Sequence, residues 1–260
     1  MKFSKQLLEW WDSHGRKDLP WQHPRTAYRV WISEIMLQQT QVKTVIPYFN
    51  RFVERFPDIQ SLAAVSNDDV LAYWSGLGYY ARARNLLKTA KICVDNHDGD
   101  LPGTPDALAA LPGIGESTAN AIYSQAFDKP AVILDGNVKR VLSRYFAVEG
   151  WPGKASVHRE LWNIAGQLLP TKREADYTQA IMDLGATMCT RTKPACDACP
   201  VNKTCKAYCA GTVEQFPAKR PALKISKKSF QMVILLDKDG KVLLERRPPA
   251  GIWGGLWALP

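Results

Sequence analysis

Residues 108–145 read LAALPGIGESTANAIYSQAFDKPAVILDGNVKRVLSRY, and the rest of the chain is organised around this segment. It opens with an apolar helical turn, breaks at Pro112–Gly115, and continues with small and apolar residues at helical spacing. The pattern predicts a helix, a glycine hairpin and a second helix. Gly113 and Gly115 let the backbone turn sharply near a partner, while the unbonded amides at the start of the second helix attract an anion. These features predict a contact with one phosphate of a nucleic acid backbone.

A lone carboxylate follows the hairpin. The apolar run 131–134 brings Asp135 to the point where another helix, predicted over 138–145, begins. An acid in this position commonly caps the helix. Because Asp135 lies close in sequence to the predicted phosphate site, it is also a candidate for acting on something bound with the nucleic acid.

The overall charge favours the same partner. The 260 residues carry a formal net charge of +9, which is typical of proteins that bind polyanions. No apolar run approaches the roughly 18 to 20 residues that a membrane-spanning helix needs. The N-terminus mixes charges with helically spaced apolar residues, unlike a signal peptide. We therefore expect a cytoplasmic, nucleoid-associated protein that has no membrane contact.

Helical periodicity extends over most of the first 190 residues. Predicted helices cover 4–13, 28–36, 47–56, 68–75, 80–97, 154–168 and 173–188. Ser4 is expected to cap the first of these, and Pro47 to lie in the first turn of the third. Glu34 lies among apolar neighbours just before the amide-rich run Gln38-Gln39-Thr40-Gln41. A surface position is the simplest interpretation of Glu34, but the amides beside it can satisfy exposed base edges.

A loop of mixed character joins two of these helices. Residues 76–85 read GLGYYARARN and combine a flexible backbone with aromatic rings and arginines. Such a segment can wedge a ring between bases and neutralise phosphates, with Tyr79 and Arg82 as the candidates. The alternative is that Tyr79 and Tyr80 are core aromatics.

Four of the six cysteines lie within residues 189–205. Cys189, Cys196, Cys199 and Cys205 follow the spacing C-x6-C-x2-C-x5-C. A zinc ribbon usually has two separated C-x2-C pairs, and this segment has one. Four closely spaced thiolates fit an iron–sulfur cluster better than zinc.

The composition changes after residue 210. Residues 211–228 have the composition of a linker, while 230–236, Asp239-Gly240 and 242–244 predict a strand, a tight turn and a returning strand. Two or three strands do not form a stable domain alone. We therefore expect this segment to be the incomplete start of a second domain.

In combination, the hairpin, Asp135 and the cysteine cluster resemble the helix–hairpin–helix DNA glycosylase superfamily. Four segments narrow the resemblance to the adenine DNA glycosylases of the MutY type, and the similarity covers essentially the whole chain. These segments are SEIMLQQTQ (33–41), GLGYYAR (76–82), ILDGNVKR (133–140) and WGGLW (253–257). The resemblance implies a mostly α fold of two helical subdomains with a [4Fe-4S] loop held by the four cysteines, followed by a truncated β-rich, Nudix-like domain.

The resemblance also implies a domain plan. A helical catalytic domain spans 1–210, followed by a linker at 211–228 and the start of a Nudix-like domain at 229–260. The catalytic domain comprises a six-helix barrel at about 27–132 with the hairpin near 108–122, flanking helices 1–26 and 133–188, and the iron–sulfur loop 189–205. In this family the Nudix-like domain recognises 8-oxoguanine. Because only its start is expected here, we expect adenine excision with poor discrimination of 8-oxoguanine from guanine.

The implied activity is base excision repair. Such an enzyme removes adenine mispaired with 8-oxoguanine or guanine from double-stranded DNA, and we expect a monomer. Glu34 matches the acid that protonates the leaving adenine, Asp135 matches the carboxylate that stabilises the sugar cation, and Asn137 helps to position the reacting groups. These roles require that burial raise the pKa of Glu34 while Asp135 stays ionised.

Further positions follow from the same resemblance. Gln38 and Tyr79 match residues that enter the double helix around the lesion, and Gln22 and Gln179 fall where family members contact the flipped adenine. The other expected DNA contacts are Gln39, Arg82, Gly113, Gly115, Ser117 and Lys139.

Two other functions are weighed against this one. In endonuclease III-like relatives, which also cleave the strand through a Schiff base, a lysine occupies the position of Ser117. A serine cannot form that imine, so the sequence predicts a monofunctional glycosylase, with Lys139 as an adventitious amine. A non-catalytic DNA-binding module would bind in a salt-sensitive manner without base release, and it would not need both Glu34 and Asp135.

Overall fold

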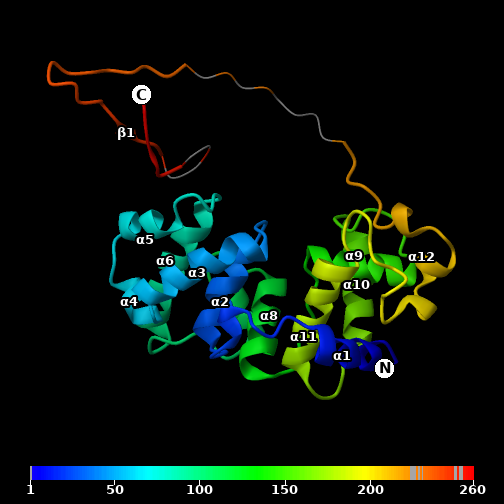
Figure 1. Cartoon of the computed structure of the whole chain (residues 1–260). Helices are drawn as coiled ribbons and strands as arrows, with labels where there is room; N and C mark the ends of the chain where they lie inside the picture. Colours follow the sequence, from blue (N-terminus) through cyan, green and yellow to red (C-terminus); the bar gives the residue numbers. More distant parts are fainter. Residues whose placement is uncertain (1, 223–226, 228, 230, 249–250, 252–253) are drawn as a thin grey trace.

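The computed structural model describes residues 2–222, 227, 229, 231–248, 251 and 254–260. These residues form a largely helical molecule with an extended C-terminal segment (Figure 1). The α-helices are α1 (Lys2–His14), α2 (Ala27–Leu37), α3 (Val42–Arg55), α4 (Ile59–Ala63), α5 (Asn67–Trp74), α6 (Ala81–Asn96), α7 (Pro105–Ala109), α8 (Glu116–Phe127), α9 (Gly136–Phe146), α10 (Ala155–Gln167), α11 (Glu174–Asp183) and α12 (Lys206–Cys209). The 3-10 turns are η1 (Pro20–Gln22), η3 (Asn202–Thr204) and η4 (Val213–Gln215), and η2 (Leu184–Met188) is a π-helical turn.

The first helical body consists of η1 and α2–α8, which pack around large apolar side chains. Trp31, Phe49, Phe52 and Trp74 are fully buried in this core. In α3 the buried side chains recur three or four residues apart, so the helix presents one apolar face inward. Burial of these aromatic rings supplies much of the apolar area that holds the first helical body together.

The second helical body joins the two ends of the helical region. α1 lies beside α11 and packs with α9 and α10, although it precedes the first helical body in the sequence (Figure 1). Leu7 and Trp11 of α1 share a core with Leu142 of α9 and Leu161 of α10. The apolar stripe of the N-terminal helix is therefore satisfied by helices that are distant in sequence.

Helix α8 connects the two bodies, because it packs against α2 and α7 on one side and α11 on the other. The Ser124 and Thr178 hydroxyls lie 2.7 Å apart across the α8–α11 contact. The carboxylate of Asp128, just after α8, accepts a hydrogen bond of 3.0 Å from the backbone amide of Ala175. These bonds fix the junction along which the cavity described below lies.

Most predicted helix boundaries agree with the observed ones to within one or two residues. Two expectations about helix starts are wrong. Helix α3 begins at Val42, so Pro47 lies inside it and not in its first turn. Ser4 lies inside α1, buried, and is not its cap. Helix α4 was not predicted, because it is too short for a periodic pattern. Its signal was a capping box, in which Asp58 accepts from the Ser61 amide at 2.7 Å.

The predicted helix 173–188 is correct in extent but not uniform. α11 ends at Asp183, and the next five residues form the π-helical turn η2. π turns occur mostly as local bulges and often at functional sites. Here the turn brings Gly185 against the start of α9, as the site geometry below shows.

The C-terminal segment contains less sheet than the sequence predicted. The expected strands reduce to one bridge, between Leu236 and Val242, around the predicted turn at Asp239-Gly240, where Gly240 has a φ of +77°. A short antiparallel pair, β1 (Glu245–Arg246) and β2 (Trp257–Ala258), follows. Phe230, at the start of the first expected strand, and Trp253, in the WGGLW segment, lie outside the described residues.

Polar contacts with α5 and α6 connect this segment to the first helical body. Arg246 pairs with Asp68 of α5 at 2.8 Å, and Arg84 of α6 donates to the Gly254 carbonyl at 2.6 Å. The segment runs away from α12 and returns beside α5 and α6 (Figure 1). Within the part of the chain that the structure describes, no helix combines the length and apolarity needed to cross a membrane.

The predicted linker begins as ordered structure. Residues Val213–Gln215 form η4, and the Phe216 carbonyl accepts a 2.9 Å hydrogen bond from the guanidinium of Arg144 in α9. This arginine also holds the cysteine loop, so the first part of the linker is fastened to the second helical body.

Candidate active site

A cavity of about 740 Å³ lies at the junction of the two helical bodies. Its wall is formed by the N-terminal loop, α2 and the loop after it, the start of α8, the start of α9, α11 and η2. Six predicted site residues line it, namely Glu34, Gln38, Ser117, Asp135, Asn137 and Gln179. A cavity of this size is typical of a small-molecule or nucleoside site.

Asp135 lies at the N-terminus of α9. It is the N-cap of this helix, and its carboxylate accepts hydrogen bonds from the Val138 amide at 2.7 Å and from the Asn137 side chain at 3.1 Å. The carboxylate also lines the cavity. Burial raises its pKa above the ordinary range, against the opposing effect of these two donors. Asp135 is therefore both a helix cap and an acid in a cavity, so the two interpretations of the sequence are compatible.

Glu34 lies on α2, in the wall of the same cavity. Its Oε1 accepts a hydrogen bond of 3.1 Å from Nε2 of Gln125 in α8. Burial and, second, the negative charge of Asp135 raise the pKa of Glu34 to about 7. The role that the resemblance implies for Glu34 requires this direction of pKa shift, because the acid must hold a proton near neutral pH.

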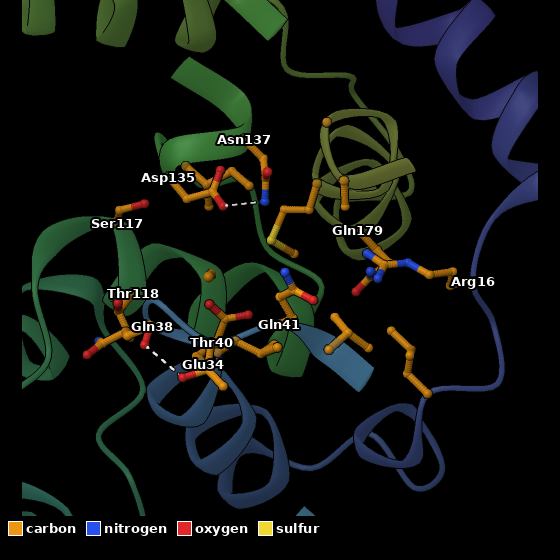
Figure 2. A pocket seen from close by; sticks show the side chains of 18 of the residues that line it. Arg16, Glu34, Gln38, Thr40, Gln41, Ser117, Thr118, Asp135, Asn137 and Gln179 are labelled. Carbon is orange, nitrogen blue, oxygen red and sulfur yellow. Dashed lines mark hydrogen bonds between the residues drawn. The ribbon is translucent and has the colours of Figure 1, made fainter. Parts of the chain in front are cut away.

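The two carboxyl groups project into the cavity from different walls, Glu34 from α2 and Asp135 from the start of α9 (Figure 2). Hydrogen bonds from the Val138 amide and Asn137, and the nearby charge of Arg140, lower the pKa of Asp135, whereas Glu34 has only the hydrogen bond from Gln125 to lower its own. Asp135 is then the carboxylate of the pair and Glu34 the acid. When the surroundings of two acids move their pKa values apart, one acid can donate a proton while the other, as a carboxylate, stabilises positive charge.

Ser117, in the first turn of α8, positions the segment that carries Asp135. Its hydroxyl accepts a hydrogen bond of 3.0 Å from the backbone amide of Leu134. Ser117 lines the cavity, whereas Lys139 does not. The lysine in the cavity wall is Lys43, at the start of α3, which the sequence analysis did not single out.

Asn137 is locked by Arg140, one turn further along α9. Nη2 of Arg140 donates to the Asn137 side-chain oxygen at 2.9 Å and to the Gly185 carbonyl at 2.7 Å, and its Nε donates to the Cys189 carbonyl at 2.8 Å. The start of α9, the π turn and the cysteine loop are thus connected through one guanidinium. Sequence reasoning missed Arg140, although it stands in the ILDGNVKR segment.

Gly185 is needed where the π turn touches α9. A Cβ at this position would stand 2.6 Å from the Cβ of Asn137 and 3.2 Å from its backbone. Because the neighbour is partly backbone, it cannot move aside without displacing the residues around Asp135.

We expect Gly185→Ala to lower the free energy of unfolding by about 1–3 kcal/mol, as overpacked sites do. The adenine release that the resemblance implies should also slow, because Asn137 and Asp135 shift together. Urea unfolding and single-turnover base release measure the two effects. Gly166→Ala is the matched control, since its Cβ would make only an ordinary contact of 3.6 Å with Val132. A Gly185→Ala protein as stable and active as this control would contradict the packing argument.

The structure corrects the expectation for Arg82. Its guanidinium is buried and does not face outward. Nη1 donates to the carbonyls of Ile35, Met36 and Gln38 at 2.7 to 2.9 Å, and Nη2 donates to Gly78 at 3.2 Å. Because the guanidinium is buried and donates its hydrogen bonds to these carbonyls, it is not available to a phosphate. Arg82 instead fixes the loop that carries Gln38 to the loop that carries Tyr79.

Two other predicted DNA contacts lie at exposed loop tips. Tyr79 is 59% exposed, so it is not a core aromatic, whereas Tyr80 packs partly against the first core. Gln39 is also exposed, and both Gln39 and Tyr79 have a positive φ, +60° and +48°. A left-handed backbone at non-glycine residues marks places where the surrounding structure holds a loop in an uncommon shape.

The hairpin forms where it was predicted. Gly113 has a φ of +79°, and a Cβ there would stand 2.8 Å from the side chain of Asn85 in α6. Gly115 caps α8, and a Cβ at Gly115 would meet no atom within 4 Å. Gly113 is therefore required for packing and conformation, and the open space at Gly115 leaves the start of α8 accessible to a partner.

The two predicted base-pocket residues are placed differently. Gln179 lines the cavity, but Gln22 is absent from its wall and buried, with Nε2 lacking a hydrogen-bond partner. The N-terminal loop contributes Arg16 and Trp21 to the cavity instead. The 3-10 turn η1 explains the error, because it turns adjacent side chains in different directions.

The four clustered cysteines surround one small cavity of about 30 Å³. Burial, together with the neighbouring thiols, raises the pKa of Cys199 to about 11. Arg144 donates to Sγ of Cys189 at 3.4 Å and to the Thr190 carbonyl at 2.7 Å, whereas Cys209 is exposed and outside the cavity wall. Four thiols facing one another beside a buried cation fit an iron–sulfur cluster, whose anionic charge the arginine offsets.

Among the described residues, no three His, Cys, Asp or Glu side chains are close enough together to hold one metal ion. In a four-iron cluster each cysteine binds a different iron, so the sulfurs stand further apart than around one ion.

Comparison with known proteins places this geometry in a family. The model of the HhH-GPD superfamily base excision DNA repair proteins matches residues 32–167. The adenine DNA glycosylase of Buchnera aphidicola subsp. Baizongia pistaciae is 42% identical over 258 residues, which is 99% of this chain and 73% of that protein. The human adenine DNA glycosylase is 36% identical over 312 aligned positions, covering 99% of this chain and 57% of the human protein.

Solved structures agree in fold. A thermostable thymine-DNA glycosylase has a TM-score of 0.73 at 29% identity, covering 80% of this chain and 96% of that one. An endonuclease III in a non-covalent complex with DNA has a TM-score of 0.68 at 23% identity, covering 81% of this chain and 95% of that one, and shows the fold alone. The chain therefore belongs to the HhH-GPD superfamily of base excision DNA repair proteins and, within it, to the adenine DNA glycosylases, which are hydrolases acting on DNA.

Proposed function

We propose that this glycosylase removes adenine mispaired with 8-oxoguanine or guanine from double-stranded DNA, acting as a monomer and without strand cleavage. The observation that carries the proposal is that Glu34 and Asp135 face one cavity, in which burial and the charge of Asp135 raise the pKa of Glu34 to about 7. The domain plan predicted from the sequence forms part of the proposal.

The cavity suits a base removed from the stack. An enzyme cannot reach the glycosidic bond inside a duplex, so the nucleotide must be flipped out, and unpairing costs least at a mispair. Gln38, at the end of α2 in the cavity wall, and the exposed ring of Tyr79 are joined through Arg82, which holds both loops. We assign these two side chains to the space that the flipped adenine vacates.

Phosphate contacts come from other elements. The accessible start of α8 at Gly115 presents backbone amides, and Lys139 and the exposed Gln39 add polar groups. The net charge of +9 adds a sequence-independent attraction. These contacts position the duplex, while the cavity selects the base.

Bond cleavage divides between the two acids. Glu34 gives its proton to N7 of adenine as the C1′–N9 bond breaks, and the bonding electrons leave with the base. Asp135 stabilises the positive charge that develops on the sugar, held in place by the Val138 amide and Asn137. Glu34, now a carboxylate, takes a proton from the water that adds to C1′ and returns to its acid form.

Release of free adenine tests the proposal. We expect single-turnover release from duplexes containing A:8-oxoguanine and A:G, and none from a matched A:T duplex. A protein that binds all three duplexes and releases no base would favour the non-catalytic alternative. Release accompanied by efficient strand cleavage would favour the endonuclease III-like alternative.

Ser117 supports the absence of strand cleavage, because its hydroxyl cannot form an imine with the abasic sugar. We expect little covalent product when the reaction with A:8-oxoguanine DNA is treated with borohydride. Any weak adduct should be lost in Lys43→Met, since Lys43 lines the cavity, and persist in Lys139→Met. Strong trapping that survives both substitutions would contradict the assignment.

We propose that Cys189, Cys196, Cys199 and Cys205 hold a [4Fe-4S] cluster. The support is the shared cavity and the adjacent guanidinium of Arg144. When bound, such a cluster ties the loop together and supplies an electron-transfer centre.

The purified protein should contain about four irons per chain and absorb visible light. Cys199→Ser should lower both the iron content and the thermal stability, because a ligand is lost and the loop loosens. Cys209→Ser is the matched control, since this exposed thiol lies outside the cavity wall. One zinc and no iron in the purified protein would show that the assignment is wrong.

A further inference from the structure

One buried carboxylate near the cavity has no part in the chemistry proposed above. Asp183, the last residue of α11, is 1% exposed and accepts five hydrogen bonds. Arg16 provides three of them, from its backbone amide at 2.8 Å, from Nε at 2.8 Å and from Nη2 at 2.6 Å. Trp11 of α1 donates from Nε1 at 3.1 Å, and Gln179 donates from Nε2 at 2.7 Å. Asp183 thus gathers donors from α1, the loop after it and its own helix.

The bond to Gln179 determines which end of that amide the cavity meets. A primary amide has a donating NH₂ and an accepting oxygen on opposite sides of one carbon. An ionised carboxylate only accepts, so Nε2 must be the atom that faces Asp183. Since Gln179 lines the cavity, its oxygen Oε1 is the atom left for a bound base.

We propose that Asp183 is a positioning residue that fixes the Gln179 amide with its oxygen toward the cavity, and thereby selects a base that carries an amino group at position 6. This inference rests on the proposed function, in which the cavity receives a flipped purine. Adenine presents the N6 amino group and donates to Oε1. Hypoxanthine has an oxygen at the same position, so two acceptors would face each other and neither would be satisfied.

Arg16 explains why the arrangement is rigid. Its side chain reaches Asp183 through two nitrogens and also lines the cavity, so the ion pair forms part of the wall. The carboxylate of this pair is buried, so it has little freedom to rearrange, because it would otherwise be left without its partners. The donors to Asp183 thus hold the carboxylate that in turn holds the Gln179 amide.

The test compares two bases in one sequence context. Duplexes carrying adenine or hypoxanthine opposite 8-oxoguanine are used to measure the ratio of their single-turnover release rates. In Asp183→Asn the introduced amide can donate as well as accept, so the Gln179 amide is free to turn its NH₂ toward the cavity. We expect the adenine-to-hypoxanthine ratio to fall by about tenfold relative to wild type, which corresponds to about one hydrogen bond.

The ratio separates positioning from general damage. Partial unfolding lowers both rates equally, because both are measured on one preparation, and only a change in the cavity alters their ratio. Asp176→Asn is the matched control: it also removes a carboxylate of α11 that pairs with an arginine, Arg173, and Asp176 is not in the cavity wall. This control should keep the wild-type ratio.

A second variant keeps the inference testable should Asp183→Asn fail to fold. Gln179→Leu removes the amide and leaves the four other bonds to Asp183 in place, and its ratio should fall to a similar level. Where both single variants fold, the double variant should show no further fall, because the two residues act through one contact. A wild-type ratio in either single variant would overturn the inference. Failure of the wild-type protein to release any adenine would refute the proposed function instead.

Discussion

Asp135→Asn is expected to slow adenine release by about three orders of magnitude, because the charge that stabilises the sugar cation is lost at the point where that cation forms. The folded state should change little. Asparagine caps helices about as well as aspartate, so the bond from the Val138 amide can persist. The measurement is single-turnover release from an A:8-oxoguanine duplex, together with thermal unfolding of the variant.

Asp58→Asn is the matched control for this substitution. Asp58 also caps a helix through its carboxylate, with the Ser61 amide as donor at 2.7 Å, and it lies outside the cavity wall. Its adenine release should equal that of the wild type. An Asp135→Asn enzyme that retains more than a tenth of the wild-type rate would remove the electrostatic role from the mechanism.

Glu34→Gln should lower the rate by about 10²- to 10⁴-fold, as expected for loss of a general acid. The pH profile distinguishes this role from a merely structural one. With the pKa of Glu34 raised to about 7, the acid form is present below pH 7 and is lost above it. The wild-type rate should therefore fall about tenfold per pH unit above about 7, and the residual rate of Glu34→Gln should not show this fall.

Two neighbours of Glu34 should shift the high-pH fall of the rate, the alkaline limb of the pH profile, in opposite directions. The hydrogen bond from Gln125 lowers the pKa of Glu34, so Gln125→Leu should shift the fall to higher pH. The charge of Asp135 raises the same pKa, so the residual activity of Asp135→Asn should begin to fall at lower pH. A limb that stays in place in both variants would mean that another group carries the titration.

Local sequence was sufficient for the elements that carry the chemistry. The glycines of the hairpin, the helical spacing after Gly115 and the position of Asp135 at a helix start all follow from patterns a few residues long. The structure has each of them, with α8 beginning at Glu116 and Asp135 capping α9. Helix starts are predictable in this way because a cap satisfies amides of its own first turn and needs no distant partner.

The same local reasoning failed where a side chain has more than one way to be satisfied. Arg82 stands in a flexible, aromatic loop that reads as a phosphate contact, yet its guanidinium is buried among the carbonyls that end α2. Gln22 is polar and near the cavity, but it is turned away from the wall. Which partner such a group finds depends on elements that are distant in the sequence.

The hairpin, the helical periodicity, the cysteine spacing and the two candidate acids can all be read from the amino-acid order alone. The shared cavity of Glu34 and Asp135 and the hydrogen bond between Gln179 and Asp183 depend on how the helices pack in three dimensions. The physical reason is that desolvation and charge–charge interaction depend on what surrounds a group in space. The raised pKa of Glu34 results from the packing of α2, α8 and the start of α9 around it. No short segment of the sequence encodes that packing.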